Sequence, residues 1–170
     1  MNLNLRIIEK KSAVLKAWHN ATLAVPAGAR ADFLDKQTAL IVESMGCDLE
    51  EGVGWLFDAL QKGGIPDDVS RFLDGMIRVR AESDFTASQA VLFIHAIKDV
   101  VRKELGNEIL ADPSVGEELS AWDSIVDDLV LYAFNIYARC RENVLDAKAE
   151  EERQATIRLL KKAKLITNNE

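Results

Sequence analysis

The sequence predicts an all-α fold, and three observations support this. Apolar residues recur at intervals of three or four along most of the chain, as they do on one face of an α-helix. Helix-start signals and glycine or proline stops separate these stretches. No stretch alternates apolar and polar residues over the length of a strand, and there is no internal repeat or low-complexity segment. We therefore expect helices packed around one apolar core.

The N-terminal half predicts four amphipathic helices. The first runs over residues 5–22 and the second over 32–45, with a Pro-Ala-Gly turn between them. The third begins at Cys47-Asp48 and ends before the Gly63-Gly64 pair. The fourth covers 67–80 and starts directly after a proline, which favours a helix start because it lacks the N–H group that would be unpaired there.

Two capping boxes predict where the next two helices begin. In Thr86-Ala-Ser-Gln89 the threonine hydroxyl can accept the N3 amide while the glutamine reaches back, so a helix should run to Leu105 and stop at Gly106. Ser114-Val-Gly-Glu117 predicts a second start. That second helix contains residues 122–137, the longest apolar stretch of the chain.

The apolar stretch predicts a helix with no solvent-exposed side. Almost every residue from Leu129 to Ala138 is apolar, so at about 100° per residue the apolar surface surrounds the helix. The run is too short for a membrane span, which needs about 18 residues or more. We therefore expect it to be buried in the domain or between two copies.

The C-terminal region predicts a helical extension. Neither glycine nor proline follows Gly116, and a helix over 117–164 would be about 70 Å long at 1.5 Å per residue. Such a helix must project, fold back or pair with a partner. We therefore divide the chain into a helical domain, 1–145, and a C-terminal helical extension, 146–170.

Charge and composition narrow the classes of partner. The 28 acidic and 21 basic side chains give a net charge of −7, which repels nucleic acid and anionic membranes. The N-terminus lacks the features of a signal peptide, so we expect a cytoplasmic protein. Cys47 and Cys140 lie far apart in sequence, neither belongs to a CxxC pair, and the chain has only two histidines, so we expect no Cys/His metal site within one copy. We expect both thiols to be reduced.

Arg80 is the most informative single residue. It extends the apolar stripe of the 67–80 helix, where an unpaired guanidinium is expensive to bury. We expect an ion pair that ties two helices together, with a carboxylate from Asp84, Asp99 or Glu104. The alternative is that arginines line a pocket for an anionic ligand or a docking partner. The candidate signal or partner site comprises Arg78, Arg80, Asp84 and Arg102.

Other reactive residues do not form a recognisable site. His95 lies on the charged border of its helix, so we expect a surface histidine and neither a haem nor a metal ligand. Cys140 lies between two arginines that could lower its pKa, but adjacent helical residues point about 100° apart. The chain contains no hydrolase, zinc-protease or P-loop motif. We therefore predict no catalytic residue, no metal and no cofactor.

Three stretches resemble the RsbRD N-terminal domain, the sensor part of the RsbT co-antagonist proteins of the bacterial stressosome. They are WLFDALQKG (55–63), FLDGMIRVRAESDFTASQAVLFIHAIKDVVRKEL (72–105) and LYAFNIYARCRENV (131–144). The middle stretch carries the most characteristic pattern: Arg78, Arg80, Ala81, Asp84, Phe85, Ser88, Gln89, Ala90, Lys98, Arg102, Glu104 and Leu105.

The resemblance implies a globin-like domain without haem that dimerises and passes a signal along its C-terminal helix. In the co-antagonists that helix leads into a STAS domain, whereas the present sequence stops at Glu170. We therefore expect signalling through a separate, unidentified protein partner or through the helix itself.

These observations predict a non-catalytic sensor or regulatory domain that acts as a homodimer in stress signalling, with a small molecule as a possible signal. The candidate dimer interface comprises Trp122, Val126, Leu129, Val130, Ala133, Phe134 and Tyr137. The alternative is a small-molecule or haem binding module with a cavity lined by Phe72, Met76, Phe93 and Ile97.

Overall fold

The structure, a computed structural model, describes residues 3–23, 35, 39, 47–83, 85–111 and 113–163. Within these ranges it contains α1 (Leu3–Glu9), α2 (Lys11–Leu23), α4 (Leu49–Lys62), α5 (Asp67–Glu82), α6 (Ala87–Ala111) and α7 (Pro113–Lys162). The all-α prediction with a long C-terminal helix is confirmed. The helix predicted over 32–45 falls almost entirely outside the described residues.

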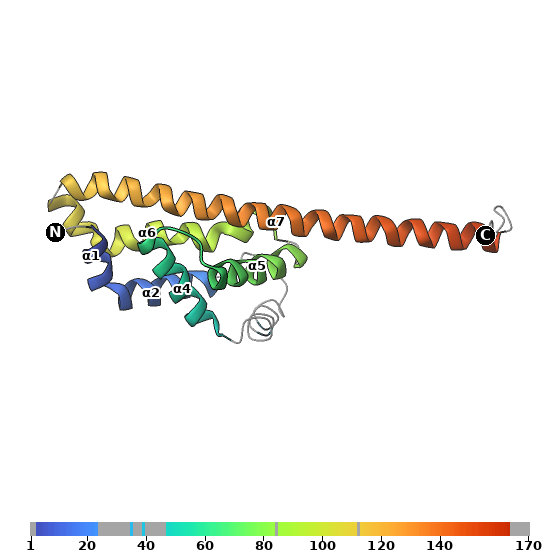
Figure 1. The fold of residues 1–170 in the computed structure, drawn as a ribbon, viewed down its shortest axis with the longest axis horizontal. Helices are drawn as coiled ribbons and strands as arrows, with labels where there is room; N and C mark the ends of the chain where they lie inside the picture. The colour runs from blue at the N-terminus through green and yellow to red at the C-terminus, as the bar shows by residue number, and fades with distance from the viewer. Residues whose placement is uncertain are drawn as a thin grey trace.

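Helix α7 organises the molecule. Figure 1 shows α6 running beside the first half of α7, with α1, α2, α4 and α5 forming a further layer beneath them. Chain direction reverses between α6 and α7, so the two helices are antiparallel. The second half of α7 projects beyond all the other helices.

The core forms where α2, α4, α5, α6 and α7 meet. Its largest enclosed side chains include Trp18, Phe57 and Phe72, and the Trp18 indole N–H donates to the Phe93 carbonyl oxygen at 2.6 Å. The four residues predicted to line a ligand cavity, Phe72, Met76, Phe93 and Ile97, are all at most 2% exposed and belong to this packed core. Apolar side chains therefore fill the space in which the alternative interpretation placed a ligand.

Helix starts follow the predicted capping chemistry. The Glu51 N–H donates to Asp48 Oδ1 at 2.8 Å, which caps α4 at the predicted place. The Thr86 box forms in both directions: the Gln89 N–H donates to Thr86 Oγ1 at 3.3 Å, and the Thr86 N–H to Gln89 Oε1 at 2.9 Å. The Pro66 start of α5 is also confirmed.

Two predicted boundaries near residues 106–114 are wrong. Helix α6 continues through Gly106 to Ala111, because Gly106 does not adopt the left-handed conformation that ends a helix and Ile109 packs against the core. Helix α7 begins at Pro113, so Ser114 lies in its first turn and is not the cap. The single helix predicted over residues 5–22 is in fact two helices, because Lys10 separates α1 from α2.

Helix α7 is one unbroken helix of 50 residues, about 75 Å long. From Lys148 to Ala163 its side chains are exposed, except Ile157 and Leu160, which are half-buried. Of the three alternatives for this region, the structure shows projection. In the part of the chain that is described, no helix combines the length and the apolar content needed to cross a membrane.

The expectation that the apolar stretch has no exposed side is wrong for a single chain. Val126, Leu129, Ala133 and Ile136 face the core, because α4, α5 and α6 cover that side of α7. On other sides, Leu131 is 61% exposed, Phe134 45% and Ile125 38%.

Candidate functional site

Arg80 is buried at the junction of α2, α5 and α6, with only 3% of its surface exposed. Its guanidinium group contacts main-chain carbonyl oxygens and aromatic rings: Thr22 O at 3.2 Å, Gln89 O and Ala90 O at 3.5 Å, and the ring centres of Phe93 at 4.5 Å and Phe85 at 5.7 Å. Burial lowers the pKa of Arg80 to about 10, because desolvation disfavours the charged form.

The position of Thr22 explains part of this arrangement. It lies in the last turn of α2, where carbonyl oxygens have no partner within the helix and the helix dipole favours a cation. Arg80 therefore ties α5 to the C-terminal end of α2 and to the first turn of α6. Among the predicted carboxylate partners, Asp99 is exposed on α6, and Asp84 lies outside the described residues.

The structure gives the other two arginines of the candidate site separate partners. Arg78 is exposed and pairs with Asp74 of the same helix, with 2.6 Å between Nη2 and Oδ2. Arg102 pairs with Asp123 across α6 and α7. One turn away, the largely buried Lys98 pairs with Asp127 at 2.7 Å, a contact that the sequence analysis did not identify. Arg78, Arg80 and Arg102 thus do not line one pocket.

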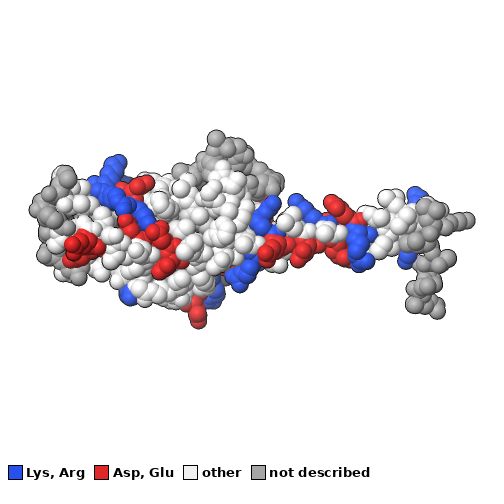
Figure 2. All heavy atoms as spheres, turned by 90° about the horizontal axis from the view of Figure 1, so that it is seen from above, with Lys and Arg blue, Asp and Glu red and all other residues white. Residues whose placement is uncertain are grey.

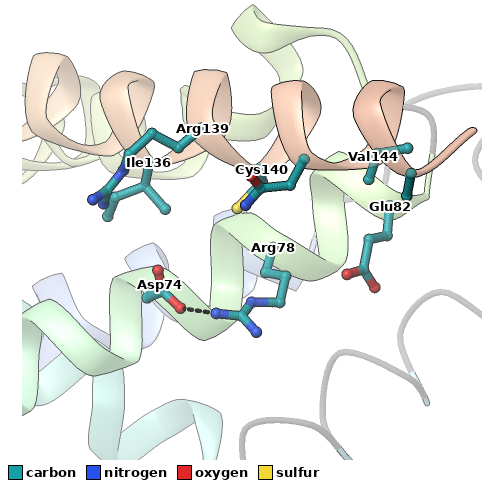
Figure 3. A pocket seen from close by; sticks show the side chains of 9 residues that line it. Asp74, Arg78, Glu82, Ile136, Arg139, Cys140 and Val144 are labelled. Carbon is teal, nitrogen blue, oxygen red and sulfur yellow. Dashed lines mark hydrogen bonds and ion pairs between the residues drawn. The ribbon is translucent and has the colours of Figure 1, made fainter. Parts of the chain in front are cut away.

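A groove of about 450 Å³ lies between α5 and α7, at the point where α7 leaves the domain. Figure 3 shows Asp74, Arg78 and Glu82 along the α5 side and the Cys140 sulfur at the centre. The α7 side is formed by residues of successive turns: Ile136, Arg139, Cys140, Asn143, Val144 and Ala147. Of the candidate-site arginines, Arg78 lines this groove, whereas Arg80 is buried and Arg102 pairs with Asp123.

Neither thiol has the features of a reactive cysteine. Burial, and then the carboxylate of Asp74, raise the pKa of Cys140, and the opposing effects of Arg78 and Arg139 are smaller. The other flanking residue, Arg141, points elsewhere and donates to the Ala81 carbonyl oxygen. Burial is also the main cause that raises the pKa of Cys47.

Three of the exposed apolar residues lie at one level of α6 and α7. Because the Lys98–Asp127 and Arg102–Asp123 pairs fix the antiparallel register, Leu92 of α6 lies level with the exposed Leu131 and Phe134 of α7. We call Leu92, Leu131 and Phe134 the apolar seam. Figure 2 shows a broad area without charged residues on the domain, between the charged cluster and the charged projecting helix.

The predicted dimer-interface residues divide between two sides of α7. Trp122, Val126, Leu129 and Ala133 are buried within their own chain, and Val130 and Tyr137 are half-buried. Phe134 belongs to the apolar seam. Sequence periodicity alone did not distinguish these sides because both are apolar.

The remaining candidate ligands are far from forming a metal site. His95 is exposed, as its helical register predicted. Within the described ranges, no three His, Cys, Asp or Glu side chains come close enough together to hold a metal ion.

Comparison with known proteins identifies one family. The model of the RsbT co-antagonist protein rsbRD N-terminal domain matches residues 17–152. These residues include α4, α5 and α6, the second half of α2, and α7 up to residue 152. Searches of curated proteins and of solved structures gave no match to this chain. The family match confirms the resemblance and the globin-like fold class. The chain belongs to the RsbRD N-terminal domain family, the sensor and regulatory module of the RsbT co-antagonist proteins of the stressosome.

Proposed function

We propose that this domain is a non-catalytic cytoplasmic module that dimerises through the apolar seam and relays a signal to a protein partner through the projecting part of α7. The observation that carries the proposal is the seam: three large apolar side chains at one level of two adjacent helices, each about half exposed or more. Single exposed apolar residues are common on protein surfaces, whereas a contiguous group is typical of an interaction site.

A second copy of this chain is the binding partner that fits the apolar seam best. A two-fold axis through the seam would place α6 and α7 of both copies in one four-helix arrangement, in which each copy covers the same residues of the other. The ion pairs of Lys98 and Arg102 would lie at the border of this interface, where charged side chains remain hydrated.

The projecting part of α7 continues the same exposed side. Leu131, Leu145 and Leu159 are all exposed and follow one another at intervals of 14 residues, or two heptads. In two parallel helices with a left-handed supercoil, residues at this interval return to the same side. Polar residues between them keep this contact weak. A change in the arrangement of the two domains would therefore alter how the two projecting helices lie against each other.

Sedimentation velocity at micromolar protein tests the dimer. The wild type should sediment as a dimer, and Phe134→Glu should sediment as a monomer with the chain mass of 18.9 kDa. Ile125→Glu is the matched control, because Ile125 is similarly exposed on α7 but faces the opposite side of the helix. A monomeric wild type would refute the proposal, and so would equal dissociation by the two substitutions.

Pull-down experiments test the relay. The full chain should capture a protein partner, and a chain truncated after Val144 should lose that partner while it retains the melting temperature of the domain. This result is expected because nearly all described residues beyond Ala147 are exposed and contribute little to the core. Retention of the partner by the truncated chain would place the contact on the domain and contradict a relay through the helix.

A second candidate function is small-molecule binding in the groove between α5 and α7. The groove combines apolar Ile136 and Val144 with charged Arg78, Glu82 and Arg139, so it could hold a ligand that carries both apolar and charged groups. Native mass spectrometry of the purified protein tests this alternative. A bound molecule released by Val144→Arg would favour it, and an unliganded mass would favour the interaction module.

A further inference from the structure

Three residues of α7 make polar contacts with the domain just before the helix projects. The hydroxyl groups of Tyr132 and Ser70 lie 2.6 Å apart, which joins α7 to the start of α5. The Tyr137 hydroxyl donates to the Phe85 carbonyl oxygen at 2.6 Å. Arg141 Nη1 donates to the Ala81 carbonyl oxygen at 3.0 Å.

Two of these contacts hold the turn between α5 and α6. Tyr137 and Arg141 are one helical turn apart, so they lie on the same side of α7. Their acceptors are the carbonyl oxygens of Ala81, in the last turn of α5, and of Phe85, between α5 and α6. We call the described residues between α5 and α6, which are Ser83, Phe85 and Thr86, the α5–α6 turn. Helix α7 is thus bonded both to the end of α5 and to the α5–α6 turn. A small rotation or shift of α7 would lengthen both hydrogen bonds.

The same turn is bonded to Arg80. The Phe85 N–H donates to the Arg80 carbonyl oxygen at 3.2 Å, and the Ser83 N–H donates to the carbonyl oxygens of Val79 and Arg80 at 3.0 and 3.3 Å. The Phe85 side chain is buried in a small cluster with Val79 and Ala90, against which Tyr137 also packs. The Arg80 guanidinium therefore lies over the Phe85 ring, and the Tyr137 hydroxyl binds the Phe85 carbonyl oxygen.

We propose that the α5–α6 turn is the coupling element of this domain. It couples the position of α7, at the base of the projecting helix, to the contacts that Arg80 makes with α2 and α6. Displacement of α7 releases the turn and loosens the contacts of Arg80 with Thr22 and the first turn of α6. By linkage, loss of the Arg80 contacts also loosens α7 at Tyr137 and Arg141. This proposal rests on the proposed function in one respect, which is that the signal relayed by the domain is the event that moves α7.

Amide hydrogen exchange followed by NMR tests the first direction. Tyr137→Phe and Arg141→Met should each raise the exchange rates of the Ser83 and Phe85 amides about fivefold, the factor expected for one lost hydrogen bond. Tyr132→Phe is the matched control: it removes a hydroxyl of equal hydrogen-bond length from the same helix but does not touch the turn. If all three variants change these two amides equally, the turn is not the coupling element.

Alkylation of Cys140 tests the reverse direction. Cys140 lies on α7 between Tyr137 and Arg141 and is half-buried, whereas Cys47 is buried elsewhere. Arg80→Met should raise the alkylation rate of Cys140 at least severalfold. Leu56→Ala, a core substitution on α4, provides a control of comparable instability. Equal acceleration by both variants at matched stability would show only general loosening and would overturn the proposal.

The outcome of these two experiments should not depend on dimerisation. Both experiments are repeated with Phe134→Glu as the starting protein, in which the seam is disrupted. The coupling requires the same pattern of exchange and alkylation in both backgrounds. A wild type that is monomeric but keeps this pattern would refute the proposed function alone, and a dimeric wild type without this pattern would refute the coupling alone.

Discussion

Gly52 of α4 permits the closest approach between α4 and α5, and its replacement by alanine should destabilise the fold. A Cβ atom at Gly52 would lie 2.0 Å from Phe72 Cε2 and 2.3 Å from Cδ2, well inside van der Waals contact. The Phe72 ring is completely buried, so it cannot move into solvent to make room. Either the two helices must separate or the ring must leave its preferred rotamer.

The magnitude follows from two opposing effects. Alanine in place of glycine favours a helix by about 0.5–1 kcal/mol. Overpacking a core by one methyl group costs about 1–3 kcal/mol. Because the added Cβ atom would lie only 2.0 Å from the ring, the cost should fall in the upper part of this range, about 2–3 kcal/mol. Gly52→Ala should therefore lower the free energy of unfolding by about 1–2.5 kcal/mol, which corresponds to about 2–10 °C in melting temperature for a chain of this length.

Gly54→Ala is the matched control, because a Cβ atom at Gly54 of the same helix would meet no atom within 4 Å. It should raise the free energy of unfolding by about 0.5–1 kcal/mol through helix propensity alone. Urea and thermal unfolding followed by circular dichroism compare the two variants. Phe72→Leu should partly rescue Gly52→Ala, since the clash involves the ring. Equal stability of Gly52→Ala and Gly54→Ala would refute this account of the packing.

Three further predictions concern charged and titrating groups. Arg80→Met should lower the free energy of unfolding by about 2–3 kcal/mol in urea titrations, because buried carbonyl oxygens lose their donor; an unchanged midpoint would contradict this. Cys140 should react with a disulfide reagent at pH 7 more slowly than a free thiol, because its raised pKa leaves less thiolate; faster reaction would contradict it. Hydrogen bonds from Arg153 and Gln154 lower the pKa of Glu150 to about 2, so its stabilisation of the projecting helix is present above about pH 4.5 and lost toward pH 2; Glu150→Gln should remove this acid dependence in NMR shifts of the helix.

Local signals were sufficient for several helix starts. The Thr86 box, the Asp48 cap and the proline before α5 each involve groups within three or four residues of one another, so their hydrogen bonds can be anticipated without knowledge of the fold. The buried position of Arg80 was also predictable, because it continues the apolar stripe of α5. Its contact with Thr22 was not predictable, since 58 residues separate the two.

Helix ends were less predictable. Gly106 is a common type of stop signal, but the next turn of α6 brings Ile109 against the core. Burial of an apolar side chain there outweighs the modest cost of glycine within a helix. The break at Lys10 was missed because the apolar periodicity continues across it.

The sequence by itself determined the all-α class, the family and the presence of a long C-terminal helix, because these depend on periodicity, composition and short motifs. Only the tertiary structure decided which side of α7 is covered by its own chain and which side carries the apolar seam. The physical reason is that the apolar residues of this helix look equivalent in sequence. Their roles differ only after α4, α5 and α6 have packed against one side and left Leu131 and Phe134 exposed on another.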